Sequence, residues 1–195
     1  MNEFEYYLIE RDGKYASPLL MNDDEFDEDG TMFLRNMEKV EEGTTVHLAF
    51  MKSPQKPDMT DYLWLSGGRS VFSKKIYDIL KDTAVKDFQL VSAIIKDPKG
   101  NEYSDYWIAG IYREFAFLSE EESEFDSKTS SGRWSGIEKM VINEEEMAKV
   151  PLAERLIYVG KESSAYVFYH KSIVDAIMSV NPTGVRFVRV EDWTN

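Results

Sequence analysis

The sequence predicts an α+β fold, in which a mixed and mostly antiparallel sheet is combined with a few short helices. Short apolar runs rich in β-branched and aromatic residues recur along the 195-residue chain, and turn-forming residues separate them. Two segments instead show apolar residues at helical spacing, and a third opens with a capping Asn followed by three glutamates. The length and the 43% hydrophobic composition favour a single domain over residues 1–195. The pattern of predicted strands and helices is sparsest in residues 1–60.

The first predicted strands lie in the N-terminal third of the chain. Phe4–Ile9 is an aromatic and β-branched run, and the Asp12-Gly13 pair after it is typical of a turn. Val46–Met51 and Tyr62–Leu65 are shorter runs on either side of a loop that contains two prolines. Residues 22–30 are nearly all acidic, and charge repulsion there favours an exposed loop.

Three segments are predicted to be helices. Ser70–Leu80 has apolar residues at positions 71, 72, 76, 79 and 80, and Ser70 or Ser73 is placed to cap its start. Asn143–Lys149 opens with a capping Asn and three glutamates, whose charge favours a helix N-terminus. Ser172–Val180 carries four apolar residues at helical spacing.

The middle of the chain predicts a hairpin followed by a loop. Phe88–Ile95 and Tyr103–Leu118 are expected to be antiparallel neighbours, because residues 97–101 have the composition of a hairpin turn. Glu120–Ser131 is acidic and serine-rich, which predicts a mobile loop. Further strands are expected at Ile137–Ile142, Arg155–Val159, Tyr166–Tyr169 and Val185–Val190.

The charge of the chain limits its partners. It has 36 acidic and 23 basic residues, a formal net charge of −13, and such a field repels nucleic acid and anionic membranes. The chain has no cysteine, which removes disulfides and thiolate chemistry. Residues 1–10 are acidic and aromatic, unlike a secretory signal, so we expect a cytoplasmic protein.

One acidic segment resembles the opening of a calcium loop. Glu25, Asp27 and Asp29 alternate and are followed by Gly30, as in a loop whose carboxylates face one ion. The twelfth position, however, is Asn36 where a bidentate glutamate is needed. A solvated acidic loop is therefore the favoured interpretation, and no metal or other cofactor is predicted.

Other candidate sites have simple structural explanations. His47 lies in a strand pattern and is expected to be partly buried, and His170 is expected in the first turn of a helix. Ser66–Arg69 resembles an anion-binding turn before a helix, but it lacks the full phosphate-loop pattern, so a flexible turn from a strand into a helix is favoured. A carboxylate pair for hydrolysis would be recognised only from its separation in space. No catalytic residue is predicted.

The two acidic stretches are the most unusual features of the sequence. Negative charge in exposed segments keeps a domain soluble, and it is also complementary to a basic partner. Trp134, which lies between two glycine-containing pairs, is the tryptophan expected to be exposed. The predicted partner-binding residues are therefore Asp23, Asp24, Glu25, Asp27, Glu28, Asp29, Glu120, Glu121, Glu122, Glu124, Asp126 and Trp134.

The order of the predicted strands and helices in the C-terminal half can be compared with known families. An aromatic, β-rich segment at Asp105–Leu118 is followed by Gly136–Ile142, and the helix Ser172–Val180 then leads into Asn181–Phe187. Together with the predicted helix Ser70–Leu80, this order resembles the bacterial toxin-immunity proteins of family eleven over about residues 60–190. The resemblance implies neutralisation of a cognate toxin domain by protein contact, inside the cell that makes the toxin. It implies no catalytic motif.

Two other classes of function remain open from the sequence. A carboxylate-based hydrolase would need a deep pocket with two carboxylates whose pKa values are displaced. A calcium-dependent binding module would need a bound ion that stabilises the folded state. The oligomeric state, the strand order and the proximity of the two acidic stretches do not follow from the sequence.

Overall fold

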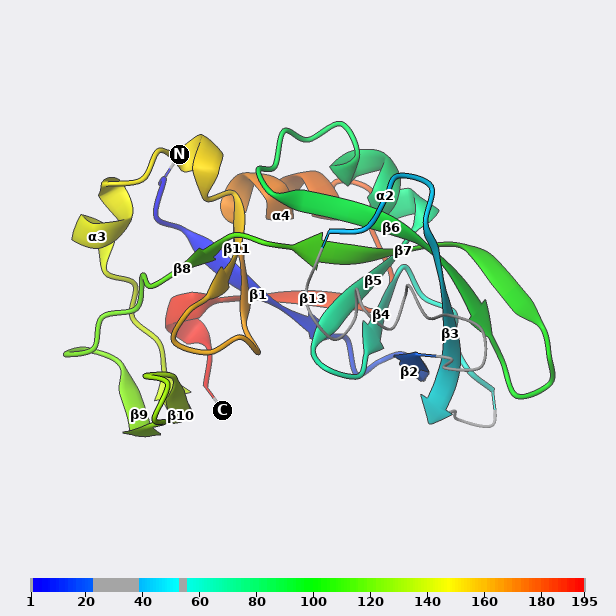
Figure 1. Cartoon of the computed structure of the whole chain (residues 1–195), viewed down its shortest axis with the longest axis horizontal. Coiled ribbons are helices and arrows are strands. Elements are labelled where there is room, and N and C mark those ends of the chain that lie inside the picture. Colours follow the sequence, from blue (N-terminus) through cyan, green and yellow to red (C-terminus); the bar gives the residue numbers. More distant parts are fainter. Residues whose placement is uncertain (1, 23–38, 53–55, 195) are drawn as a thin grey trace.

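The computed structural model describes residues 2–22, 39–52 and 56–194 (Figure 1). The predicted α+β class is confirmed. The described residues form a closed six-stranded barrel, a five-stranded sheet, a two-stranded hairpin and three short α-helices. The barrel lies at one end of the molecule, and the hairpin lies at the other (Figure 1).

The barrel has the strand order β2-β3-β6-β7-β5-β4. Its strands are β2 (Leu19–Asn22), β3 (Thr45–Lys52), β4 (Tyr62–Leu65), β5 (Arg69–Ser73), β6 (Phe88–Lys96) and β7 (Glu102–Ile111). Two pairs, β2–β4 and β3–β6, are parallel, and the others are antiparallel. Leu20, Leu48, Leu63 and Ile108 fill the interior, where each is fully buried. Closure leaves the barrel without exposed strand edges.

The five-stranded sheet has the order β13-β1-β12-β11-β8. Its strands are β1 (Tyr6–Arg11), β8 (Glu114–Phe115), β11 (Ile157–Gly160), β12 (Val167–His170) and β13 (Val185–Arg189). Alternate residues of β1 serve two cores, because successive side chains point to opposite faces of a strand. Tyr7 and Ile9 pack toward the barrel with α2 (Lys74–Leu80) and α4 (Lys171–Met178), whereas Tyr6 and Leu8 pack on the other face.

That second face carries the hairpin and a short helix. The hairpin consists of β9 (Glu124–Lys128) and β10 (Trp134–Lys139), and the helix α3 is Glu144–Ala148. Two 3₁₀ turns, η1 (Leu152–Glu154) and η2 (Val190–Asp192), complete this end of the molecule. Trp134, Ile137, Met140 and Met147 pack together against Tyr158 and Phe168 of the sheet.

Several predicted elements are confirmed. The antiparallel pair β6–β7 is joined at the expected turn, where the Asp97 carboxylate accepts hydrogen bonds from the amides of Lys99 and Asn101 at 2.8 and 2.9 Å. Helix α3 is capped by Asn143, whose Oδ1 accepts from the Glu146 amide at 3.0 Å. Helix α4 also lies where its spacing predicted it.

The predicted helix at residues 70–80 is half wrong. Residues Arg69–Ser73 form β5, and the helix begins only at Lys74. Val71 points into the barrel, whereas Phe72 points into the core between the barrel and the sheet. A strand buried on both faces has consecutive apolar residues, and such a run followed by a helix mimics one longer helix. Ser73 holds the N-cap position, but its hydroxyl donates to Asp61.

Two further predictions are corrected. Glu120–Ser131 is not simply a loop, because Glu124–Lys128 forms β9 and pairs with β10. The long strand predicted at Tyr103–Leu118 is divided: β7 ends at Ile111 in the barrel, and β8 pairs with β11 in the other sheet. Strand β2 was not predicted, because its four residues are too short to show a period.

Candidate partner-binding site

Carboxylates from four separate segments meet at the hairpin end of the molecule. One depression is lined by Glu121, Glu122, Glu144 and Glu191, and a second is lined by Glu124, Glu138 and the same Glu191. We call these six residues, all exposed, the acidic face. Residues 119–149 contain nine acidic and four basic side chains, so this region is strongly negative.

Two hydrogen bonds between separate segments position the acidic face. The Ser119 amide donates to the Val141 carbonyl at 2.7 Å, and the Val141 amide donates to Ser123 Oγ at 3.0 Å. These two bonds join the Ser119–Ser123 turn to the chain that leads into α3. The Asn143 cap then places Glu144 in the first turn of that helix, beside Glu121 and Glu122.

The hairpin is anchored by Trp134, which is only 8% exposed. Its ring stacks on Phe125 with the ring centroids 4.2 Å apart, and its amide donates to the Glu162 carbonyl at 2.7 Å. The predicted exposure of Trp134 is therefore wrong. The neighbouring glycines belong to a hairpin, whose strand β10 turns this indole toward the core.

The buried carboxyl group of Glu162 forms a hydrogen bond beside the acidic face. Glu162 Oε1 accepts from the Leu118 amide at 2.8 Å, just before the Ser119–Ser123 turn. Burial raises the pKa of Glu162, because the ionised form loses hydration. Its other oxygen, Oε2, has no hydrogen-bond partner within the described part of the chain.

The structure separates the predicted acidic residues into three groups. Glu121, Glu122 and Glu124 belong to the acidic face, whereas Glu120 pairs with Lys128 and the Asp126 side chain lies against Gly136. The third group lies outside the described residues: Asp23, Asp24, Glu25, Asp27, Glu28 and Asp29, together with Gly30 and Asn36 of the calcium-like pattern. Sequence reasoning missed Glu138, Glu144 and Glu191 as members of the acidic face, because their proximity depends on tertiary contacts.

Some carboxylates of the acidic face form ion pairs and others do not. Lys139 Nζ lies 3.9 Å from Glu124 Oε1, and Arg189 pairs with Glu191 at 2.7 Å. Within residues 2–22, 39–52 and 56–194, Glu121, Glu122 and Glu144 form no ion pair. All three of these carboxylates are exposed to solvent.

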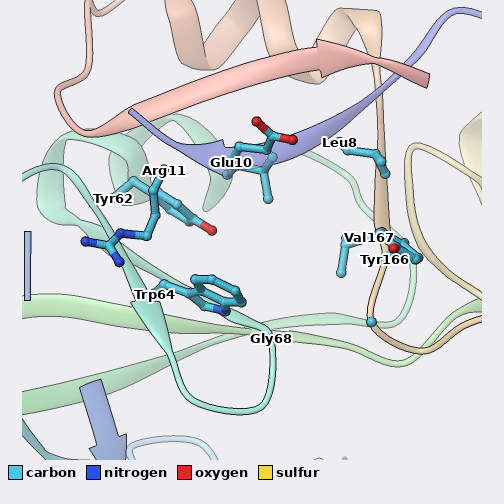
Figure 2. Close-up of a pocket in the computed structure, with 10 residues that line it drawn as sticks. Leu8, Glu10, Arg11, Tyr62, Trp64, Gly68, Tyr166 and Val167 are labelled. Carbon is cyan, nitrogen blue, oxygen red and sulfur yellow. The ribbon is translucent and has the colours of Figure 1, made fainter. Parts of the chain in front are cut away.

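A second concave region lies between the barrel and the five-stranded sheet. It consists of two pockets of about 350 Å³ each, which share Gly68 and Val167. Figure 2 shows Arg11, Tyr62 and Trp64 on one side of the first pocket, and Tyr166 and Val167 on the other.

The turn beside these pockets corrects another expectation. Ser66–Gly68 joins β4 to β5, so it is a turn between two strands and not the expected turn from a strand into a helix. Gly67 and Gly68 both have positive φ angles, which explains why glycines occupy this tight turn.

The two histidines lie in different elements, one on a strand and one at the start of a helix. His47 is half-buried on β3, as expected. His170 is fully buried at the N-cap of α4, where Nδ1 accepts from the Ser172 amide at 3.2 Å. Burial lowers the pKa of His170.

The two pockets between the barrel and the sheet do not bring carboxylates together. Each pocket between the barrel and the sheet contains one carboxylate, Glu10 in the first and Glu114 in the second. The described side chains of His, Asp and Glu form no group of three or more that could hold a metal ion. Within the same residues, no helix is both long and apolar enough to span a membrane.

The fold and the acidic face together define an acidic α+β protein with a cluster of exposed carboxylates at its hairpin end. The chain belongs to the Immunity protein family (Imm11), whose model matches residues 6–192. The suspected resemblance is thereby confirmed, and it extends into the N-terminal region. No curated protein matches the chain individually.

Proposed function

We propose that this protein neutralises a cognate bacterial toxin domain by direct binding, without catalysis, in the cytoplasm of the cell that makes the toxin. Membership of the immunity family is the observation that carries this proposal. The acidic face is the proposed interface.

Electrostatics explains what the acidic face contributes. The formal net charge of −13 and the cluster of exposed glutamates attract a toxin with a cationic cleft, such as a nuclease. Such attraction raises association rate constants toward about 10⁸–10⁹ M⁻¹s⁻¹ at low salt. Rapid capture suits a protein that must reach the toxin before the toxin reaches its target.

The proposal is tested by removing charge from the acidic face. The variant Glu121→Gln/Glu122→Gln/Glu144→Gln/Glu191→Gln keeps the side-chain size and removes four charges. We expect its association rate constant for the toxin domain encoded beside the gene to be lower by about tenfold or more at low salt. We also expect this rate constant to depend less on salt than that of the wild type. Association rates are measured by stopped-flow fluorescence, and protection is measured by growth of cells that express the toxin.

A matched control removes the same charge elsewhere. Glu42, Asp82, Glu102 and Asp105 are also exposed, and none belongs to the acidic face. Their Gln and Asn variants, combined in one protein, should bind nearly as fast as the wild type. Equal slowing in both variants would show that only net charge matters, and the acidic face would lose its proposed role.

A further inference from the structure

The first of the two pockets between the barrel and the five-stranded sheet lies against one end of β1 (Figure 2). We name it the strand-edge pocket and define it by Ile9, Arg11, Trp64, Ala165, Tyr166 and Val167. Its volume is about 350 Å³. Ligand pockets usually measure about 300–1,000 Å³, so this one has room for a short ligand segment.

Strand β1 has a neighbour on each side for only part of its length. Strand β12 pairs with residues 6–8 of β1, whereas β13 pairs with residues 7–11. Strand β12 begins only at Val167, because residues 161–166 connect it to β11. In the described part of the chain, no strand takes the place of β12 beside residues 9–11.

The backbone of Arg11 faces this open side of β1. The Asp12 amide donates to the Gly184 carbonyl, just before β13, at 3.0 Å, and the Lys171 amide donates to the Glu5 carbonyl at 2.9 Å. The backbone groups of successive residues in a strand point to opposite sides, so residues 5, 7, 9 and 11 point away from β13. The amide and the carbonyl of Arg11 therefore point toward the pocket, and no described strand is paired with them there.

The walls of the strand-edge pocket are largely aromatic and apolar. Trp64 is 43% exposed, and it points outward because Leu63 and Leu65 on either side of it point into the barrel. Tyr62 and Tyr166 also line the pocket. Trp and Tyr are among the residue types most enriched where protein interfaces gain their affinity.

An open strand edge beside an aromatic wall is suited to binding an extended chain. The amide and the carbonyl of Arg11 match the carbonyl and the amide of such a chain. In strand addition, main-chain hydrogen bonds supply affinity, and pockets for alternate side chains supply specificity.

We propose that the strand-edge pocket binds an extended segment of the cognate toxin domain as a short added strand. The segment lies beside β1 where β12 has ended, and its backbone pairs with Arg11. One of its apolar or aromatic side chains packs against Trp64 and Tyr166. This inference rests on the proposed function, because it takes the toxin domain as the partner, but it does not depend on the acidic face.

Residue-resolved hydrogen exchange tests the added strand directly. In the complex with the purified toxin domain, the Arg11 amide should exchange about tenfold or more slowly than in the free protein, because it gains an acceptor. The Asp82 amide, in the exposed turn after α2, is the control and should keep its rate. An unchanged rate at Arg11 in the saturated complex would overturn the proposal.

Two substitutions at one position separate the backbone from the side chain. Arg11→Pro removes the amide proton and the guanidinium, whereas Arg11→Ala removes only the guanidinium, which donates to the Ser17 carbonyl at 2.7 Å. Proline is compatible with a strand position whose N–H faces away from the neighbouring strand. We expect the toxin domain to dissociate about tenfold or more faster from Arg11→Pro than from Arg11→Ala. Equal dissociation rates would overturn the backbone pairing.

Two further variants test the aromatic wall. Trp64→Ala removes the indole, and Ala165→Trp fills the pocket from an exposed position. Each should raise the dissociation rate of the toxin domain about tenfold or more, with little change in the association rate. Met178→Ala is the matched control, because Met178 is 41% exposed on α4 and does not line the pocket. Thermal unfolding of each variant confirms that it is folded.

The outcomes distinguish this inference from the proposed function. If the wild type binds the toxin domain and the variants Trp64→Ala and Ala165→Trp bind it as tightly, strand addition at this pocket is overturned and the immunity function stands. If the wild type does not bind the toxin domain at all, the immunity function fails, and this inference fails with it.

Discussion

At the scale of single residues, Asp61 connects three distant segments. Its carboxylate accepts from Ser73 Oγ at 2.7 Å, from the Thr183 amide at 2.8 Å and from Thr183 Oγ1 at 2.9 Å. Lys75 Nζ lies 3.6 Å away. The residue therefore ties the start of β4 to helix α2 and to the loop before β13.

These contacts make the stability of the protein depend on pH. Burial alone would raise the pKa of Asp61, but the hydrogen bonds from Ser73 and Thr183 and the charge of Lys75 outweigh it, so the pKa is lowered from 3.8. A lowered pKa stabilises the fold above the pKa of the unfolded chain. That stabilisation is lost as pH falls through the folded value, below about 4.

Asp61→Asn should therefore be destabilising at neutral pH. We expect a loss of about 1–3 kcal/mol in the free energy of unfolding at pH 7, because buried donors lose a charged acceptor. The difference from the wild type should shrink at pH 3, and urea unfolding at both pH values measures it. A loss of equal size at both pH values would contradict the role of the ionised carboxylate, and Asp82→Asn serves as the exposed control.

At the scale of elements, the hairpin β9–β10 is held by few but large contacts. Trp134 and Phe125 stack at its centre, and Ile137 and Met140 continue the same core. The outward side chains of the hairpin are mostly charged or polar. The stability of the hairpin therefore depends strongly on the indole.

Trp134→Ala should destabilise the hairpin end of the molecule by about 3–5 kcal/mol, because it removes a buried aromatic side chain and leaves a cavity. Trp64→Ala, which removes a half-exposed indole, should cost much less. Denaturant unfolding compares the two variants, and hydrogen exchange shows whether residues 119–149 open first. Equal losses in both variants would contradict the different burial of these tryptophans.

The elements that were predicted correctly from the sequence are determined by residues close together in the chain. Helix α3 follows from the Asn143 cap and the glutamates after it, and the β6–β7 hairpin follows from the Asp97–Asn101 turn. The beginning of α2 could not be predicted in the same way. Val71 and Phe72 are both buried because β5 lies between two cores, and only the tertiary structure distinguishes this strand from a helical turn.

The candidate site was predictable only in part for the same reason. The acidic run at 120–126 is visible in the sequence, but Glu144 and Glu191 join it through packing of α3 and η2. Trp134 was expected at the surface because its neighbours are typical of turns. Its stacking on Phe125 depends on the pairing of β9 with β10, which short, polar strands do not signal.

At the scale of the whole molecule, two regions of the surface differ in the chemistry of their side chains. The hairpin end presents carboxylates, whereas the junction between barrel and sheet presents tryptophan, tyrosine and arginine. In an immunity protein, the charge of the hairpin end would set how quickly a toxin with a cationic surface is captured.

We infer that the protein binds its cognate toxin domain directly, through the acidic face. Calorimetric titration of the wild-type protein with the purified toxin domain, at low and at moderate salt, tests this binding. We predict saturable binding with a defined stoichiometry, and an affinity that falls as salt rises. Absence of binding at both salt concentrations would contradict direct neutralisation, and tight binding that does not respond to salt would contradict the role of the acidic face.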